Sequence, residues 1–553
     1  MDIFLTILVL TLAVSLSGVV TRILPFQAPL PIIQIVIGAI LALPYFGMHV
    51  TFDPNLFLLL FIPPLLFSDG WKTPLRELIA NSREIIGLAL VLVLITVIGI
   101  GYLIHWMLPG LPLVAAFALA AVLSPTDAVA LSGIVGKGRM PHRLMGVLEG
   151  EALMNDASGL VALKFAILVV TGVMEFSVST ASVEFVKVAF GGLFVGIAVT
   201  WLYSRALMLM IRWRGDDPAT QIVMLLLLPF ASYLVAEHLH TSGILAAVAA
   251  GITFNHTGVM RQASIATRLR ANGVWTMLEF VFNGMVFIML GLQLPDILTS
   301  SFSQAEADKS IETWTLFLYV PLIYIALLVL RFIWFFCMKK GGDLMFKKKP
   351  MILSQYSIKD IFIATFSGVR GAITLAGVLS IPLLTDIENG IPFPGRYQLV
   401  FIATGIILIS IIVAIVILPF LLKGVQAVDH KALEAEQRIA RLAMAEAAIH
   451  TINKMQEHLS HDAEENYDDE LLQEASMNAT TTLRRRLDNR DNEERSLALE
   501  GLERRFMLAG LRAERSKLYK LRARKEISND TMNMILHDLD LLEAVLIDKD
   551  PHH

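Results

Sequence analysis

The stretch Glu149-Gly-Glu-Ala-Leu-Met-Asn-Asp-Ala-Ser-Gly-Leu160 places Glu151, Asn155 and Asp156 in the middle of an apolar run from about residue 144 to 170. An ionisable side chain at membrane depth costs free energy unless something binds it, so it marks a candidate functional site. At about 100° per residue, Glu151 and Asn155 lie along one helical face and Asp156 projects toward a neighbouring face. We therefore predict a transmembrane helix in which Asp156 alternately carries a proton and a cation.

The composition of the whole chain supports a membrane protein. Of its 553 residues, 55% are hydrophobic and 17% are charged, and the mean hydropathy is +0.65. A typical soluble protein has about 25% charged residues. The segment 426–553 holds 26 of the acidic and 19 of the basic residues. We therefore predict a transmembrane domain at 1–423 and a charged, helix-rich C-terminal region at 424–553, and we expect this region to be cytosolic and regulatory.

A window of about 20 residues predicts thirteen transmembrane segments. They lie near residues 3–21, 30–46, 55–70, 84–107, 111–136, 144–172, 182–211, 218–238, 242–256, 273–295, 312–337, 359–383 and 397–422. With the N-terminus outside, the loops assigned to the cytosol hold 21 Lys and Arg, with Arg331 counted among them, and the outer loops hold only 3. Because Lys and Arg favour cytosolic loops, this bias predicts a multi-pass protein of the cell inner membrane with an outer N-terminus and a cytoplasmic C-terminus.

Two of the predicted segments contain helix breakers. Pro125 lies in the fifth, next to Thr126 and Asp127, and Arg370 lies between glycines in the twelfth. A broken membrane helix frees backbone groups that invite ion binding. Six spans on either side of a linking seventh predict an all-α fold of two inverted six-helix repeats, with the site where the discontinuous helices meet.

Chemistry assigns provisional roles to these residues. Sodium prefers oxygen ligands, which the Asp156 carboxylate, the Thr126 hydroxyl and freed carbonyls can supply. Arg370 keeps its proton, and we expect it to form a structural ion pair with Glu151. The alternative role for Glu151 is to take part in ion transport itself.

Two of the other polar side chains, Asn155 and Asp127, each have two predicted roles. Asn155 is expected either to contact the ion or to bond between helices. Asp127 is expected either to contact the ion or to cap a half-helix.

Four segments carry a resemblance to a known family. They are Phe61-Ile-Pro-Pro-Leu-Leu-Phe-Ser-Asp-Gly70, Ser124-Pro-Thr-Asp-Ala-Val-Ala130, Gly150-Glu-Ala-Leu-Met-Asn-Asp-Ala157 and Gly368-Val-Arg-Gly-Ala-Ile-Thr374. Together they resemble the signature segments of sodium/proton antiporters of the monovalent cation:proton antiporter-1 (CPA1) family, in its bacterial branch. The resemblance covers the embedded region to about Lys423.

The resemblance implies a homodimer whose six-helix core moves against a dimerisation domain while Na⁺ is exchanged for H⁺. It implies that Asp156 is the ion-binding aspartate, with Asn155 beside it and Glu151 one turn earlier. It further matches Thr126 and Asp127 to the unwound pair and Arg370 to the basic residue facing them. Many relatives have Ser or Thr where this chain has Ala152, so a hydroxyl ligand is expected to be missing.

Rival classes are a passive cation channel, an intramembrane hydrolase and a potassium-preferring exchanger. A channel would line a continuous pore with polar residues, whereas here these residues gather at two broken helices and one acidic helix. No nucleotide loop, zinc spacing or other enzymatic motif appears, so we expect no enzyme, no cofactor and no nucleic-acid partner. The expected partners are Na⁺, H⁺, membrane lipids and a second copy of the chain.

Overall fold

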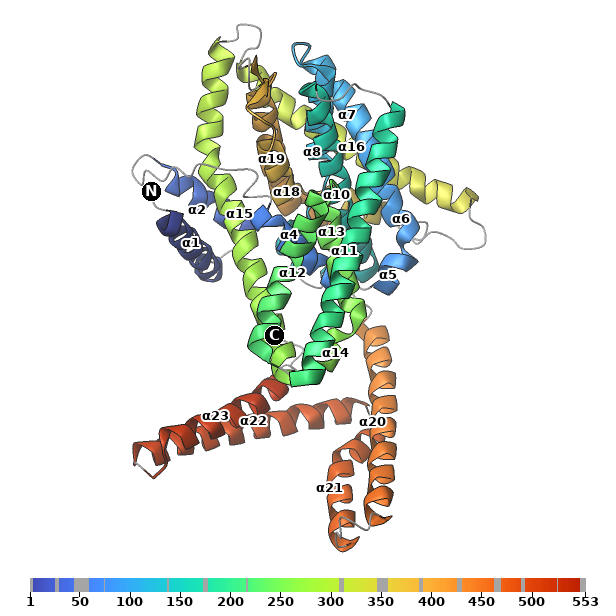
Figure 1. Ribbon diagram of the computed structural model, residues 1–553, viewed down its shortest axis with the longest axis vertical. Coiled ribbons are helices and arrows are strands. Elements are labelled where there is room, and N and C mark those ends of the chain that lie inside the picture. The colour runs from blue at the N-terminus through green and yellow to red at the C-terminus, as the bar shows by residue number, and fades with distance from the viewer. Residues whose placement is uncertain are drawn as a thin grey trace. The chain divides into compact units, whose positions relative to one another are not determined.

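The computed structural model is almost entirely helical (Figure 1). It describes residues 3–24, 29–43, 59–73, 75–136, 139–172, 178–214, 217–307, 313–345, 357–386, 391–424, 430–461, 469–488, 493–524 and 526–547. The chain divides into two compact units, Met1–Val428 and Asp429–His553.

The first unit contains the apolar helices. They are α1 Ile3–Ile23, α2 Leu30–Leu41, α4 Ile62–Lys72, α5 Leu75–Ala80, α6 Ser82–Ile86, the π-helix η1 Gly87–Leu92, α7 Val93–Met107, α8 Leu113–Leu123, α9 Ala128–Val135, α10 His142–Val170, α11 Val178–Arg214, α12 Pro218–His238, α13 Gly243–Thr257, α14 Val259–Gln262, α15 Ile265–Ala307, α16 Thr313–Met345, α17 Ile358–Phe366, α18 Ala372–Leu379 and α19 Arg396–Leu422. A short antiparallel pair, β1 Leu384–Asp386 with β2 Ile391–Pro392, precedes α19.

Nine helices of the described residues are long and apolar enough to cross a membrane, and ten if α8 and α9, bent by 45°, form one span. The predicted count of thirteen is therefore supported only in its coarser form. The other three predicted segments contain α2, with 12 residues, α4, with 11, and the broken pair α17 and α18. These pieces are too short to count as spans by length alone.

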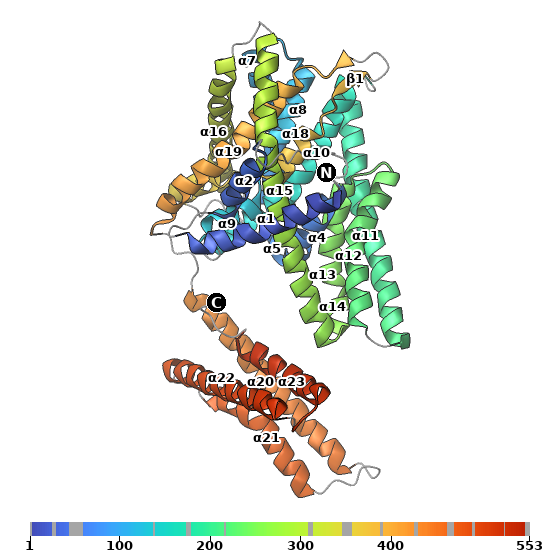
Figure 2. The ribbon, with the colours of Figure 1, turned by 90° about the vertical axis from the view of Figure 1, so that its left-hand side faces the viewer.

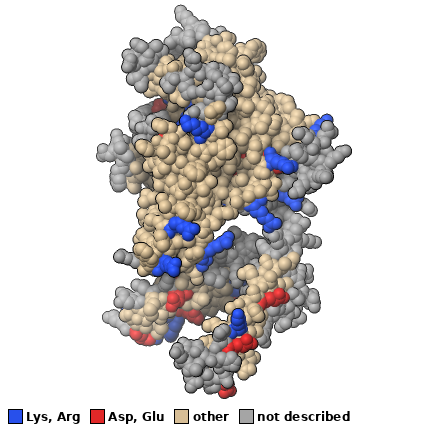
Figure 3. Space-filling view, turned by 45° about the vertical axis from the view of Figure 1, so that its right-hand side comes forward, with Lys and Arg blue, Asp and Glu red and all other residues tan. Residues whose placement is uncertain are grey.

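The surface of the first unit suits a lipid environment. Large apolar side chains such as Phe194, which is 72% exposed, point outward from the helices. On the face seen in Figure 3 most side chains of this unit are uncharged, and few Lys and Arg appear.

The helices of the first unit, seen in a second view in Figure 2, pack as two groups. We call α1, α2, α4 and α11–α15 the scaffold helices, and α6–α10 with η1 and α16–α19 the core helices. Glycines allow close backbone contact within the scaffold. A Cβ atom at Gly251 of α13 would lie 2.1 Å from the carbonyl oxygen of Phe67 in α4, and one at Gly291 of α15 would lie 2.0 Å from that of Ile35 in α2. The core group contains both broken helices.

The two predicted breaks are present. One separates α8 from α9 between Leu123 and Ala128, and the other separates α17 from α18 between Phe366 and Ala372. The breaks meet, because the backbone N–H of Asp127 donates to the carbonyl of Val369 at 2.8 Å. Two chain segments far apart in sequence thus cross in the middle of the core helices.

The second unit contains α20 His430–His461, α21 Asp469–Asp488, α22 Glu493–Ala523 and α23 Asn529–Ile547. α20 packs with α21, and α22 packs with α23. Arg515 of α22 contacts Asp540 and Glu543 of α23.

Candidate functional site

The crossing of the broken helices brings four helix ends together. Two ends are N-termini, of α9 and α18, where free backbone N–H groups create partial positive charge. The Asp127 carboxylate accepts from the N–H of Ala130 at 2.8 Å and from the N–H of Ala372 at 3.4 Å. Of the two roles weighed for Asp127, the structure therefore shows the cap, and it caps both half-helices.

A glycine makes this double cap possible. A Cβ atom at Gly371 would lie 1.8 Å from Oδ2 of Asp127, which is far inside van der Waals contact. Gly159 likewise allows α10 to approach the first break closely, because a Cβ atom there would lie 2.5 Å from the ring of Pro125. Small residues thus let the break approach its neighbours.

Arg370 occupies the opposite pair of helix ends. Its Nε donates to the carbonyl of Leu123, the last residue of α8, at 3.0 Å, and its Nη1 donates to the carbonyl of Gly368, just past the end of α17. The backbone N–H of Arg370 donates to Oγ of Ser410 in α19 at 3.0 Å. The guanidinium, 3% exposed, therefore offsets the partial negative charge where two half-helices end.

The predicted ion pair of Glu151 with Arg370 is corrected by the structure. Glu151 instead binds Arg331 of α16 through both guanidinium ends, with Nη2 to Oε2 at 2.8 Å and Nη1 to Oε1. Both residues are buried, at 1% and 4% exposure, and Nε of Arg331 also donates to the carbonyl of Ala364 in α17. A planar guanidinium suits a buried carboxylate, because it can donate hydrogen bonds to both carboxylate oxygens at once. Arg331 had been assigned to a cytosolic loop, but α16 carries it into the protein interior.

Asn155 joins the acidic helix α10 to the first break. Its Nδ2 donates to Oγ1 of Thr126 at 3.0 Å, and its Oδ1 accepts from the N–H of Thr126 at 3.5 Å. Of the two roles weighed for Asn155, the structure shows the bond between helices. The Thr126 hydroxyl keeps its own proton to donate and a second lone pair to accept or to coordinate an ion.

A cavity of about 600 Å³ lies between the core and scaffold helices. Thr126, Asp127 and Asp156 of the predicted site line it, with Ala152 one turn before Asp156. Among the described residues, Asn155, Glu151 and Arg370 do not line this cavity. The three cavity-lining residues can therefore meet an ion directly, while the other three hold the helices.

Asp156 differs from Asp127, Glu151 and Glu279, whose carboxylates accept hydrogen bonds. It is 9% exposed, and within the described part of the chain no group donates a hydrogen bond to its carboxylate. A buried carboxylate without a donor is stabilised by a proton or a cation. The Asp156 carboxylate, in the wall of the cavity, is thus a position where a proton or a cation can bind.

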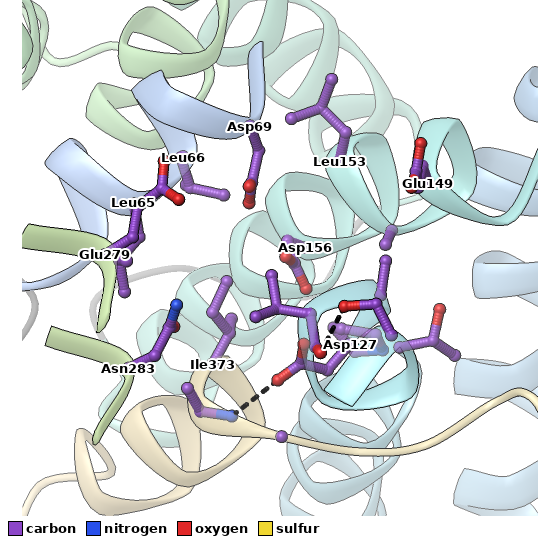
Figure 4. A pocket seen from close by; sticks show the side chains of 18 of the residues that line it. Leu65, Leu66, Asp69, Asp127, Glu149, Leu153, Asp156, Glu279, Asn283 and Ile373 are labelled. Carbon is purple, nitrogen blue, oxygen red and sulfur yellow. Dashed lines mark hydrogen bonds between the residues drawn. The ribbon is translucent and has the colours of Figure 1, made fainter. Parts of the chain in front are cut away.

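The scaffold wall of the cavity contributes acidic residues that the sequence analysis did not assign to the site. Asp69 is partly buried in this wall, and in Figure 4 its carboxylate points from α4 toward Asp156 on α10. Glu279 of α15 also lines the cavity and accepts from Ser68 and Lys72. Apolar neighbours in the sequence signalled both acids, but their opposition to Asp156 depends on tertiary packing.

Crossed half-helices beside a buried carboxylate and a cavity are typical of secondary transporters. The sequence profile described as "Sodium/hydrogen exchanger, transmembrane" matches residues 7–424. The chain belongs to this sodium/hydrogen exchanger family, and it is therefore a transporter and not an enzyme.

Individual relatives agree. The chain is 61% identical over 549 residues to an uncharacterized Na⁺/H⁺ exchanger, YjcE, of Escherichia coli K12, which covers 99% of this chain and 100% of the relative. It is 37% identical to a sodium, potassium, lithium and rubidium/H⁺ antiporter of Bacillus subtilis, over 99% of this chain and 78% of that protein. The solved sodium proton antiporter MjNhaP1 of Methanocaldococcus jannaschii, 18% identical, shares the fold with a TM-score of 0.56 over 77% of this chain and 100% of its own.

Proposed function

We propose that this protein exchanges Na⁺ for H⁺ across the cell inner membrane by binding either ion at Asp156. The observation that carries the proposal is the buried Asp156 carboxylate, which has no donor among the described residues and ends a cavity at the crossing of two broken helices. Thr126, which lines the cavity, is the second proposed ligand, and the carboxyl groups of Asp127 and Asp69 line the same cavity. Because a proton and a cation compete for one carboxylate, either ion can bind only after the other has left.

The proposed topology has thirteen spans in two inverted six-span repeats. The three spans that are too short by the length criterion are then α2, α4 and the broken pair α17 and α18. Two inverted repeats would also bring both helix breaks to the same depth in the membrane. The bias of Lys and Arg supports an outer N-terminus and a cytoplasmic second unit. Lys72 and Gly136 line the cavity and both lie next to predicted cytosolic loops, so with that orientation we propose that the cavity opens to the cytoplasm.

We further propose a one-for-one, electroneutral exchange. Asn155 precedes Asp156 and cannot carry a second proton, so one proton leaves for each cation that binds. One-for-one exchange requires Asp127, Glu151 and Arg370 to keep the same protonation throughout the cycle, and each is held by bonds to helix ends or to a buried partner. A membrane potential acts on net charge with about 2.3 kcal/mol per 100 mV, so it gives no drive to a cycle that moves none.

The cation preference has a second candidate. Two Bacillus relatives are named as sodium, potassium, lithium and rubidium/H⁺ antiporters. Ala152 lines the cavity with a methyl group, so the site lacks a hydroxyl ligand there and a weakly hydrated potassium ion becomes a stronger competitor. Potassium/proton exchange at the same carboxylate is therefore the alternative.

The proposed physiological setting follows from this activity. Exchange in the inner membrane would serve pH and sodium homeostasis. The resemblance stated above supports a homodimer built on the scaffold helices, and the helical second unit is proposed to regulate transport.

The experiment is cation-dependent dequenching of a pH-sensitive dye in everted membrane vesicles. Sodium, lithium and potassium are added in turn to vesicles energised by respiration. Dequenching by sodium supports the proposal, dequenching mainly by potassium supports the alternative, and no response to any cation contradicts both.

A further inference from the structure

An ion pair joins the core helices to the scaffold helices away from the cavity. Nζ of Lys164 in α10 donates to Oε1 of Glu237 in α12 at 2.8 Å. Lys164 of the core helices thus has its partner on the scaffold helices. The pair therefore spans the interface that would slide when the core moves.

The position of Lys164 relates the pair to the ion site. Lys164 follows Asp156 by eight residues on one continuous helix, which is about 12 Å along its axis. Glu149, Ala152 and Leu153, on the other side of Asp156 along α10, line the cavity. The ion pair and the cavity thus lie on opposite sides of the site.

The two partners are held with different rigidity. Oε1 of Glu237 also accepts from the N–H of Gly243, the first residue of α13, at 3.3 Å, so the carboxylate is fastened to the scaffold. Lys164 has a long flexible side chain that is 49% exposed. A fixed acceptor and a flexible donor can separate and meet again without rearranging either helix.

We propose that Lys164 and Glu237 form a gate that holds the core closed against the scaffold on the side opposite the cavity. The inference rests on the proposed function, because it assumes that the core moves between two states. When the cavity side closes and α10 moves, the pair must break, so it favours the state with the cavity open.

The pair is partly exposed, at 49% and 34%, and exposed ion pairs contribute little. Its loss should therefore raise the fraction of molecules open on the opposite side by about twofold to fivefold, without locking the protein. A small bias suits a transporter, because a strong pair would slow every cycle.

The test measures this fraction by cysteine labelling. Cys337, the only native cysteine, is replaced by Ser, and Leu160 is replaced by Cys. Leu160 is 4% exposed and lies one turn beyond Asp156 toward Lys164, on the line of the cavity-facing residues. A membrane-impermeant maleimide is added from the side opposite the cavity, which is the outer side in the proposed topology.

Lys164→Met and Glu237→Gln should each raise the labelling rate about twofold to fivefold, and the double variant should add nothing further. Lys164→Arg keeps a donor of the same charge and should label like the parent. Unchanged labelling in both single variants, or additive effects in the double variant, would overturn the gate. The double variant Lys164→Glu with Glu237→Lys restores a pair of opposite charges, and it should label at the parent rate. It serves as the test if the single variants fold poorly.

This outcome is separable from the transport claim. Labelling reports the open state and does not require exchange. Unchanged labelling with intact sodium/proton exchange removes the gate alone, and lost exchange in the parent protein removes the proposed function itself.

Discussion

Replacing Arg331 by Met should strongly destabilise the protein, because it leaves the Glu151 carboxylate buried without its partner. Glu151 is 1% exposed and binds Arg331 through both oxygens, so water cannot replace the lost guanidinium. Removing one member of a buried pair costs about 3–5 kcal/mol, most of it from the charge that is left behind. The expected result is a clear fall in the free energy of unfolding, measured by denaturant or thermal unfolding of the purified protein in detergent.

A double-mutant cycle separates this charge effect from simple loss of packing. Glu151→Leu combined with Arg331→Met removes both charges, and apolar replacement of a whole buried pair is often close to neutral. The double variant should therefore recover most of the stability lost by Arg331→Met. Arg370→Met is the matched control, since the side chain of Arg370 bonds to carbonyls and not to Glu151. The reasoning is refuted if Glu151 couples more strongly to Arg370 than to Arg331, or if Arg331→Met costs less than about 1 kcal/mol, as an exposed pair would.

Three further predictions concern the site and its stoichiometry. Gly371→Ala should disrupt the double cap, because its Cβ would lie 1.8 Å from Oδ2 of Asp127. We expect this substitution to lower the free energy of unfolding by about 1–3 kcal/mol, measured by thermal unfolding. The control Gly110→Ala, at a position with open space around it, should leave the stability unchanged. Ala152→Ser adds a hydroxyl to the cavity wall and should shift the preference from potassium toward sodium and lithium by a few-fold in the dequenching assay; an unchanged ratio argues that this position does not face the ion. For one-for-one exchange, an imposed potential at zero pH difference should not accelerate sodium uptake into proteoliposomes, and a steep rise with inside-negative potential would mean that a second proton is carried.

Local chemistry explains why the broken helices were predictable. Pro125 lacks a backbone donor, and the glycines around Arg370 weaken a helix, so both breaks are visible in the sequence at single-residue detail. The polar residues beside them also stood out because their surroundings are apolar. What the sequence did not show is that the two breaks touch, as the Asp127 to Val369 hydrogen bond shows, because that contact joins residues more than 200 positions apart.

The partner of Glu151 was missed for a related reason. Arg331 lies eight residues before Lys339 in a helix of 33 residues, so a hydropathy window groups it with the cytosolic cations. Its burial depends on how α16 packs against α7, α17 and α19, which periodicity does not encode. Asp69 lies three residues before Lys72 in the sequence, and only the fold shows that it lines the cavity. Residue type indicated the candidates here, and tertiary packing decided their partners.

The central claim is that Asp156 alternately binds the proton and the cation, and the most direct measurement is cation-driven exchange by Asp156→Asn. The amide has nearly the same size as the carboxylate, so the variant should fold normally. It cannot release a proton at neutral pH, so it cannot exchange a proton for a cation. Wild-type protein and the variant are reconstituted at equal density in proteoliposomes, and sodium-dependent proton movement is recorded with an internal pH dye while thermal unfolding checks the fold. The account predicts that exchange is abolished in a protein as stable as the wild type. Substantial sodium/proton exchange by Asp156→Asn would contradict it.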